Sequence, residues 1–305
     1  MKILILGSTG FIGKNLKQRL LKDGHNISTA EKSSGTDLRE YENILCKLKE
    51  TSPDVIYNLA SHGGSVHYVK TRAAEVFHDN VQMSLNLYKA VREINSKIKI
   101  IQPFSNCSYP GKSNLQREKE WLDGDVHPSV FSFGNSKRTM FYLSKCFKEQ
   151  YGIRSVNILF PNTYGPGDSI DPNHTHALNG MVIRMLAAQK NGDKEFVVWG
   201  TGSPIREWAY IDDFVEVLVR CLEIDGQEYP INMGQEKGYS IAESAKLIKK
   251  ACGYKGDIVF DTNYRDGDPI KVMSQKKFAE TLRNFKFFDH YEGILNTVNY
   301  YKEKL

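Results

Sequence analysis

Four side chains in the sequence are of types that can move protons or polarise a carbonyl group. Ser105 and Cys107 follow an apolar run that predicts a buried strand, and Lys137 stands at the start of a predicted helix. His176 lies in the loop after a glycine- and proline-rich turn. In open α/β sheets, ligands bind outside the carboxyl ends of the strands, so Ser105 and Cys107 fall where a substrate is expected. Taken alone, such a cysteine is more often inert packing, and a loop histidine is more often solvated.

A glycine-rich turn opens the chain directly after the apolar run Ile3–Leu6 and leads into a helical pattern. Such a turn lets the backbone approach a pyrophosphate, and the free N–H groups and dipole of the next helix favour an anion. The turn therefore predicts a bound dinucleotide. A glycine turn without a ligand is the alternative, which the position straight after a strand disfavours. The cofactor-binding candidates here are Gly7, Thr9, Gly10, Phe11, Ile12 and Gly13.

The choice between NAD and NADP depends on the end of the second predicted strand. An acid at this place binds the ribose 2′-hydroxyl, whereas a base accepts a 2′-phosphate. The sequence offers both, Glu31 and Lys32, and we favour NADP(H) with NAD(H) still open. Asp37 and Leu38 lie just downstream, at a place suited to contact with adenine. A helix cap ahead of Tyr41 is the alternative role for this pair.

Strands and helices alternate through the first half of the chain, which indicates an α/β fold. We predict a Rossmann-type, doubly wound parallel sheet with a smaller α/β substrate-binding lobe. The predicted strands are Ile3–Leu6, Asn26–Ala30, Val55–Ala60, Ile98–Phe104, Val156–Leu159 and Tyr229–Met233, and the predicted helices are Asn15–Lys22, Tyr41–Glu50, Val81–Ile94, Lys137–Tyr151 and Ile211–Ile224. Residues 1–165, joined by 208–235, form the predicted dinucleotide-binding domain. Residues 166–207 and 236–305 form the predicted lobe.

Composition excludes several classes of protein. The net charge of +5 comes from 41 basic and 36 acidic residues in a chain of 305, without the basic runs of a nucleic-acid face. The five cysteines form no C-x-x-C pair, and no secretory signal sequence is visible, so we expect reduced thiols and a cytoplasmic protein. No apolar run approaches the roughly 20 residues of a membrane span. The His and Cys residues show no metal-ligand spacing, so we expect no metal.

The motifs together resemble a known family. The first set resembles the extended short-chain dehydrogenase/reductases of the NAD-dependent epimerase/dehydratase type: Gly7-x-x-Gly10-x-x-Gly13, Asn58-Leu59-Ala60, Ser105, Phe133-x-x-x-Lys137 and Asn162-x-Tyr164-Gly165-Pro166. A second set is similar to the GDP-L-fucose synthases: Ser105–Pro110, Pro172-x-x-x-His176, Val197–Glu207 and Asp266–Lys271. This resemblance covers essentially the whole chain, and the second set is the more discriminating.

The resemblance implies epimerisation of a GDP-4-keto-6-deoxy sugar beside its ketone, followed by hydride delivery from NADPH to C4. Cys107 and His176 would then move protons on opposite faces of the sugar, and Ser105 would stabilise the enolate oxygen. Lys137 would act on a phenol and on the nicotinamide. The remaining implied contacts are Leu59 and Ala60 with the cofactor and Asn162, Trp199, Arg206 and Lys271 with the substrate. For Arg206, a surface ion pair with Glu207 or Asp212 is the alternative.

One residue departs from the family pattern. Where the family has a catalytic tyrosine, this chain has Phe133, which keeps the ring and lacks the acidic proton. Proton donation of this kind is typically worth ~10²–10⁴-fold in rate, so we expect slow reduction. Three explanations stand: an engineered substitution, a natural enzyme using another hydroxyl such as Ser105, or an epimerase without reductase activity. We favour the first, because only the phenolic oxygen is replaced.

The sequence leaves two other functions and the oligomeric state undecided. A reductase or epimerase of another nucleotide sugar, such as a GDP-heptose, is one alternative, and a non-catalytic dinucleotide sensor is the other. The resemblance further implies a homodimer in which helices pack across a two-fold axis. The apolar residues at helical spacing that suit this contact also suit the core: Leu85, Leu87, Tyr88, Met140, Phe141, Leu143 and Phe147.

Overall fold

The computed structural model describes residues 1–111, 113–226 and 229–305. A six-stranded sheet forms its base, in the order β10-β5-β4-β3-β1-β2. Every neighbouring pair in this sheet is parallel, which confirms the predicted fold class. The strands are β1 (Lys2–Leu6), β2 (Asn26–Ala30), β3 (Val55–Asn58), β4 (Lys99–Ser105), β5 (Ser155–Phe160) and β10 (Ile231–Asn232).

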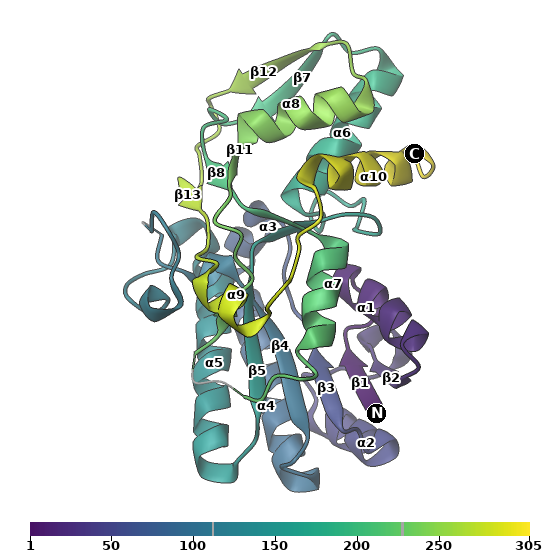
Figure 1. The fold of residues 1–305 in the computed structure, drawn as a ribbon, viewed down its shortest axis with the longest axis vertical. Coiled ribbons are helices and arrows are strands. Elements are labelled where there is room, and N and C mark those ends of the chain that lie inside the picture. The colour runs from purple at the N-terminus through teal and green to yellow at the C-terminus, as the bar shows by residue number, and fades with distance from the viewer. Residues whose placement is uncertain (112, 227–228) are drawn as a thin grey trace.

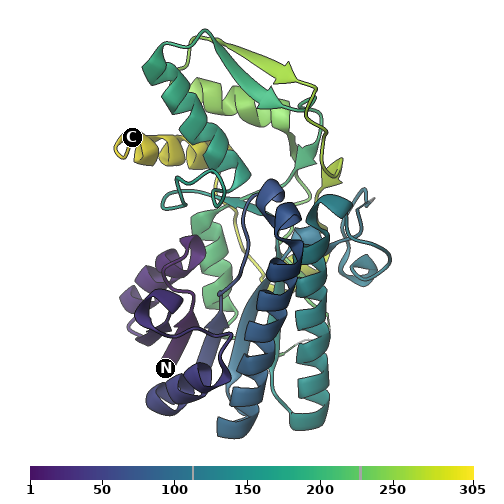
Figure 2. The ribbon, with the colours of Figure 1, turned by 180° about the vertical axis from the view of Figure 1, so that it is seen from behind.

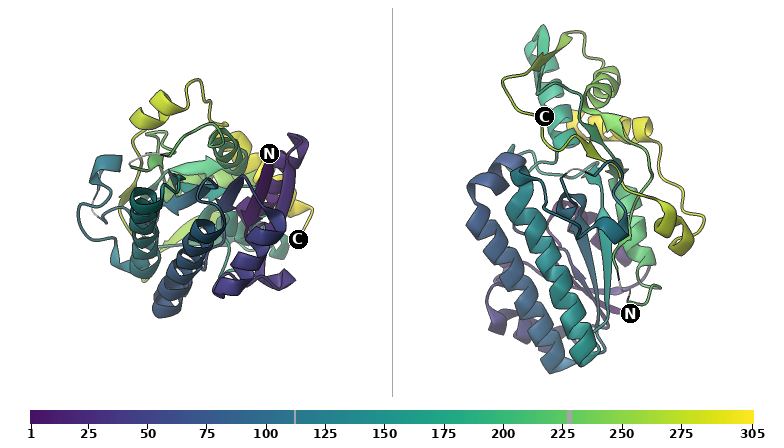
Figure 3. Two further views of the ribbon diagram at one scale, coloured as in Figure 1. Left: turned by 90° about the horizontal axis from the view of Figure 1, so that it is seen from below. Right: turned by 90° about the vertical axis from the view of Figure 1, so that its left-hand side faces the viewer.

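Helices cover both faces of this sheet (Figure 3). One face carries α1 (Phe11–Lys22) and α7 (Ile211–Arg220), and the other carries α2 (Tyr41–Thr51), α4 (Ala73–Ile94) and α5 (Phe131–Tyr151). The side chains of β1 alternate between the two faces. Ile3 and Ile5 belong to the core under α1, whereas Leu4 and Leu6 belong to the core under α2 and α4. Burial on both faces explains why β1 is an unbroken apolar run.

A second group of elements lies beyond the carboxyl ends of the strands (Figure 1). It contains α6 (Ala177–Asn191), β7 (Glu195–Trp199), α8 (Ile241–Cys252), β12 (Asp257–Asp261) and α10 (His290–Lys302), with β7 paired to β12. Short strands lie between the two groups: β6 (Asn162–Tyr164) with β9 (Trp208–Tyr210), and β8 (Ile205–Arg206) with β11 (Tyr239–Ser240) and β13 (Ile270–Lys271). The short helix α9 (Lys276–Thr281) returns beside β10. Within the described ranges, no helix has the length and apolar character that crossing a membrane requires.

In the view from behind, the short helix α3 (Val66–Thr71) lies at the end of α4 that is nearest the second group of elements (Figure 2). The sequence did not predict α3. The predicted helix starts at Asn15, Val81 and Lys137 were also wrong, because the helices begin at Phe11, Ala73 and Phe131. The predicted helical end at Ile224 was wrong as well, since α7 ends at Arg220, and residues 227–228 of the predicted segment 208–235 lie outside the described residues.

Candidate active site

The glycine turn after β1 combines two packing constraints with one open position. A Cβ atom on Gly13 would lie 2.2 Å from the carbonyl oxygen of Gly7, and one on Gly7 would lie 2.8 Å from the backbone nitrogen of Ala60. Gly7 also has a φ of +81°, which favours glycine. At Gly10, the residue before α1, the nearest atom would be 3.5 Å away. The protein's own packing therefore demands two of the glycines, while Gly10 leaves the amino end of α1 open to an anion.

A cavity of about 290 Å³ lies at this helix end. Its wall includes His176, whose Nδ1 lies 3.0 Å from Oδ2 of Asp168 and whose ring centroid lies 5.4 Å from that of Phe11. Burial would raise the pKa of Asp168, but hydrogen bonds from His176 and Asn179 hold it below its usual value. Asp168 thus fixes the orientation of the imidazole. The lining residues are Thr9, Gly10, Phe11, Lys14, Gly167, Asp168, Ser169, His174 and His176.

The acidic Glu31 and the basic Lys32 both follow directly after β2. The Glu31 carboxylate accepts hydrogen bonds from Ser8 and Ser34, while Lys32 is largely exposed. Asp37 does not cap α2, whose preceding residue is Glu40, so the predicted capping alternative was wrong. Its carboxylate instead accepts from Arg39 at 2.6 Å, and this hydrogen bond lowers the pKa of Asp37 to about 2. Leu38 beside it is buried.

Cys107 meets a cation at the carboxyl end of β4. The Nζ atom of Lys271 lies 3.3 Å from Sγ of Cys107 and donates to it, and Ser105 Oγ accepts a hydrogen bond from the Cys107 backbone. Burial alone would raise the pKa of this thiol. The charge of Lys271, hydrogen bonds with Ser105 and Lys271, and the nearby charge of Arg206 outweigh burial and lower it. Lys271 was predicted to contact the substrate, and the structure places it on the thiol.

The start of α5 approaches the same loop closely. A Cβ atom on Gly134 would lie 2.7 Å from the carbonyl oxygen of Cys107, so glycine is needed where the helix meets the loop. This contact brings Phe133 and Lys137 beside Cys107. Lys137 is buried, donates to Ser61 Oγ at 3.0 Å, and places its Nζ 5.0 Å from the centre of the Phe133 ring. Burial lowers the pKa of Lys137 to about 8.

Arg206 does not form the predicted alternative ion pair. Within residues 1–111, 113–226 and 229–305, no ion pair joins Arg206 with Glu207 or Asp212, and its guanidinium donates to the Ile205 carbonyl. Burial lowers its pKa. Nearby Asp268 is buried, and its Oδ1 has no hydrogen-bond partner in the described part of the chain. These two side chains therefore keep hydrogen-bonding capacity that a polar ligand can use.

Two further substrate candidates lie on different elements. Trp199, on β7, is 58% exposed and stacks on Tyr264 with ring centroids 5.1 Å apart. The Arg184 guanidinium lies 4.9 Å from the centre of the Trp199 ring. Asn162 begins β6, and its side-chain amide donates to the Glu207 carbonyl. Trp199 is thus exposed at the surface while Tyr264 and Arg184 contact its ring, and one end of the asparagine amide is engaged in the fold.

The structure brings Ser105, Cys107 and Lys271 together by direct bonds. His176 is held separately on Asp168, and no hydrogen bond between His176 and Cys107 is found across the described residues. The same ranges contain no group of three His, Cys, Asp or Glu side chains arranged to hold a metal ion. Asp168 was not predicted as a site residue, although it lies shortly before the motif Pro172-x-x-x-His176 in the sequence.

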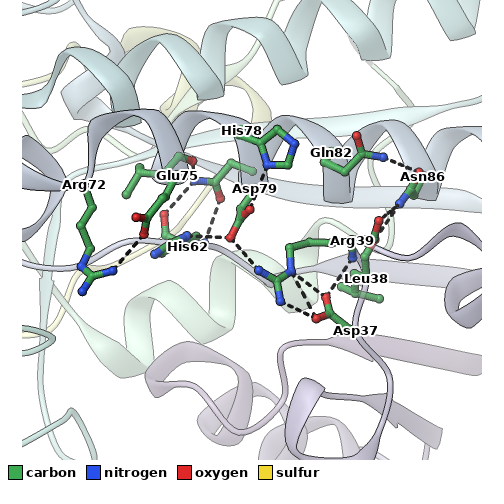
Figure 4. A network of polar contacts seen from close by, with 12 residues as sticks. Asp37, Leu38, Arg39, His62, Arg72, Glu75, His78, Asp79, Gln82 and Asn86 are labelled. Carbon is green, nitrogen blue, oxygen red and sulfur yellow. Dashed lines mark hydrogen bonds and ion pairs between the residues drawn. The ribbon is translucent and has the colours of Figure 1, made fainter.

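A polar network after β3 was also missed, because no local motif marks it. His62 Nδ1 lies 2.9 Å from Oδ2 of Asp79, and the same carboxylate oxygen accepts from Arg39 at 3.1 Å (Figure 4). The other ring nitrogen of His62 lies 2.9 Å from the hydroxyl of Tyr68. Residues from the segment between β2 and α2, the loop after β3, α3 and α4 therefore form one connected chain of hydrogen bonds beside the site.

Comparisons with known proteins agree with this geometry. The model of the NAD dependent epimerase/dehydratase family matches residues 3–234. The chain is 26% identical to "Probable GDP-L-fucose synthase 1" of Oryza sativa subsp. japonica, over 100% of this chain and 93% of that protein. The solved structure of a GDP-L-fucose synthetase from Naegleria fowleri bound to NADP is 27% identical, with a TM-score of 0.87 over 99% of this chain and 92% of that one. A GDP-6-OMe-4-keto-L-xylo-heptose reductase from C. jejuni has the same fold, at 21% identity and a TM-score of 0.91 over 99% and 98% of the chains. With its fold, its glycine turn and most of its length matched, this chain belongs to the NAD dependent epimerase/dehydratase family.

Proposed function

We propose that this chain epimerises and reduces a GDP-4-keto-6-deoxy sugar with NADP(H). The observation that carries the proposal is the contact of 3.3 Å between the Lys271 ammonium and the Cys107 thiol at the carboxyl end of β4. Abstraction of a proton beside a ketone needs a base that is deprotonated at neutral pH. A thiol whose pKa is lowered by an adjacent cation meets this need.

The other groups supply the remaining steps of the epimerisation. Ser105 accepts a hydrogen bond from the Cys107 backbone, and its hydroxyl, which also interacts with the Cys107 thiol, stabilises charge on the keto oxygen once the sugar is bound. His176 returns a proton on the opposite face, oriented by its bond to Asp168. Arg206 and Asp268 bind the polar nucleotide, and Trp199 flanks the base.

The residues around the glycine turn fit NADP(H), which supplies the hydride when bound. Gly10 leaves the amino end of α1 open, and Leu59 and Ala60 line the turn from β3. The Naegleria fowleri relative is described as bound to NADP. The exposed Lys32 is a partner for a 2′-phosphate, and Lys137 holds the nicotinamide end.

Reduction is the slower activity in this proposal. Phe133 stands beside Lys137 without a phenolic proton, so hydride transfer lacks the acid expected at this position. Loss of such an acid typically costs ~10²–10⁴-fold in rate. Cys107, Lys137 and His176 each have a polar partner, namely Lys271, Ser61 and Asp168. This arrangement favours an enzyme over a non-catalytic sensor.

The proposal includes a domain division and a homodimer. Residues 1–165 with 208–235 bind the cofactor, and residues 166–207 with 236–305 bind the sugar nucleotide. Four of the apolar residues suggested for the dimer contact are buried in the chain's own core: Leu87, Tyr88, Met140 and Phe141. The dimer contact on α5 therefore rests on Phe131 and Tyr142, which are 61% and 53% exposed.

The test is NMR of GDP-4-keto-6-deoxy-mannose with the protein and NADPH in heavy water. We expect deuterium at C3 and C5 and slow loss of the ketone. Absence of both changes would refute this substrate. A GDP-heptose ketone is the second substrate in the same assay, and turnover of that sugar alone would select the alternative. Binding of NADPH without any effect of either sugar would instead indicate a sensor.

A further inference from the structure

A hydride arriving at a ketone leaves an alkoxide that must receive a proton, and Phe133 has none to give. If the chain reduces the ketone as proposed above, on which this inference rests, one of its other side chains must supply that proton. Ser61 lies near Lys137, but its hydroxyl donates to Asn80 Oδ1 and accepts from Lys137 Nζ. Both hydrogen-bonding directions of that hydroxyl are therefore used within the protein.

Tyr68 is the phenol that lies next to Phe133. Tyr68, Cys107 and Phe133 all pack against one small cluster formed by Val69, Val76 and Val130. The loop before Tyr68 touches both rings, because a Cβ atom on Gly63 would lie 3.0 Å from Phe133 Cε2 and one on Gly64 would lie 2.9 Å from Tyr68 Cδ1. The Tyr68 phenol therefore packs against the same apolar cluster as the side chain at position 133, where the family has its catalytic tyrosine.

The same phenol reaches toward the cofactor side of the cleft. Its ring centroid lies 5.1 Å from that of His174, which lines the cavity at the glycine turn. The two loops are also joined directly, since the Ser65 backbone donates to the Asn173 carbonyl at 2.7 Å. Tyr68 thus lies between the cavity for the cofactor and the thiol at the sugar, which is where hydride transfer must take place.

Tyr68 is connected to a source of protons. Its hydroxyl lies 2.9 Å from His62 Nε2, and His62 Nδ1 lies 2.9 Å from Asp79 Oδ2. A carboxylate can only accept, so Asp79 fixes Nδ1 as a donor. The backbone of His62 is held by Asn80, which accepts from its N–H and donates to its carbonyl. Asp79 and His62 are therefore placed to act as positioning residues for Tyr68.

We infer that Tyr68 replaces the missing phenol of position 133 as proton donor to the C4 oxygen. NADPH, when bound, would supply a hydride to the carbonyl carbon, and the C=O π pair would move onto oxygen. The Tyr68 O–H bond breaks toward this oxygen, and the proton on Nε2 of the His62 imidazolium moves to the phenolate. His62 ends neutral and regains a proton from solvent. Another hydroxyl thus replaces the lost one, and it is Tyr68 rather than Ser105.

The test is a double-mutant cycle of Tyr68→Phe and Phe133→Tyr, read by single-turnover NADPH oxidation and by deuterium entry into the sugar. In the native background, Tyr68→Phe should slow ketone reduction about 10²-fold or more and leave deuterium entry unchanged. In the Phe133→Tyr background, Tyr68→Phe should leave reduction unchanged, because the restored phenol donates the proton. His62→Gln should follow the same pattern. Tyr229→Phe, at an exposed tyrosine outside the site and the proposed dimer contact, is the matched control.

Three outcomes overturn the inference and leave the proposed substrate standing. The first is undiminished reduction in Tyr68→Phe, with or without loss of reduction in Ser105→Ala. The second is a native chain that exchanges deuterium and never reduces the ketone. An equal loss in both backgrounds, with loss of deuterium entry, would indicate that Tyr68 is only structural and would also overturn it. A native chain that shows neither exchange nor reduction refutes the proposed function, and this inference with it.

Discussion

Lys271→Met removes the positive charge beside the Cys107 thiol while keeping an unbranched apolar chain. The two groups are 3.3 Å apart. At an effective dielectric constant of about 20, opposite unit charges at this separation attract by about 5 kcal/mol. Each pKa unit corresponds to about 1.36 kcal/mol, and lost hydration of both charges offsets part of the attraction. We therefore expect the pKa of Cys107 to rise in Lys271→Met.

The assay is the pH dependence of iodoacetamide alkylation, resolved by mass spectrometry for each cysteine, since only the thiolate reacts. Cys46 and Cys146 are exposed and serve as internal controls. Cys221 and Cys252 are buried and should stay unmodified in the folded protein. Lys271→Arg keeps the charge and is the matched variant. We expect its alkylation midpoint for Cys107 to stay near that of the native chain.

The same shift should appear in function. Deuterium entry into the sugar should require higher pH in Lys271→Met, because the base forms later as the pH rises. Overlapping alkylation curves for Cys107 in the native chain and Lys271→Met would refute the assignment of Lys271 as the cause of the lowered pKa. A shifted alkylation curve with an unshifted exchange profile would instead remove Cys107 from the role of base.

Four other substitutions test the remaining geometry. Gly13→Ala should destabilise the fold by about 2 to 3 kcal/mol in urea unfolding, because its Cβ would lie 2.2 Å from a carbonyl oxygen. Gly10→Ala should keep the melting temperature and weaken NADPH binding by calorimetry about tenfold, because its methyl group stands where a pyrophosphate meets the backbone; equal binding would place the dinucleotide elsewhere. Gly134→Ala should push α5 from the Cys107 carbonyl, now 2.7 Å from the added Cβ, and slow exchange by up to about 10²-fold with little change in cofactor binding; unchanged exchange would show that the loop adapts. Phe133→Tyr should raise the reduction rate at least about tenfold in stopped-flow oxidation of NADPH, because it restores a phenol beside Lys137; equal rates would show that Tyr68 replaces that phenol fully.

The sequence predicted the fold wherever periodicity and turns agree. The glycine turn and the strand Asn26–Ala30 lie where the pattern placed them. The first turns of α5 could not be predicted, because Ser132, Gly134 and Ser136 are buried there as small residues that allow close approach. Small polar residues resemble a loop in sequence, and only the contact with the β4 loop shows that they form a helix.

The missed parts of the candidate site are contacts between distant segments. Lys271 reaches Cys107 through β13, which pairs with β8, and no spacing in the sequence encodes this approach. The bonds among His62, Tyr68 and Asp79 likewise depend on how α3 stands over α4. The position of Cys107 at the end of a predicted strand and the family resemblance together marked it as a candidate. The identity of its cation and of the nearby phenol required the three-dimensional arrangement.

Glu207 joins the segments that alternate between the two halves of the molecule. Its carboxylate accepts from the backbones of Gln235 and Met273, and its own backbone bonds to Asn162 and Lys271. Those four residues lie where the chain passes from one half to the other. Neither half can therefore loosen without breaking bonds to a buried carboxylate, which is costly. The two halves should consequently melt in a single calorimetric transition, and Glu207→Ala should split that transition into two.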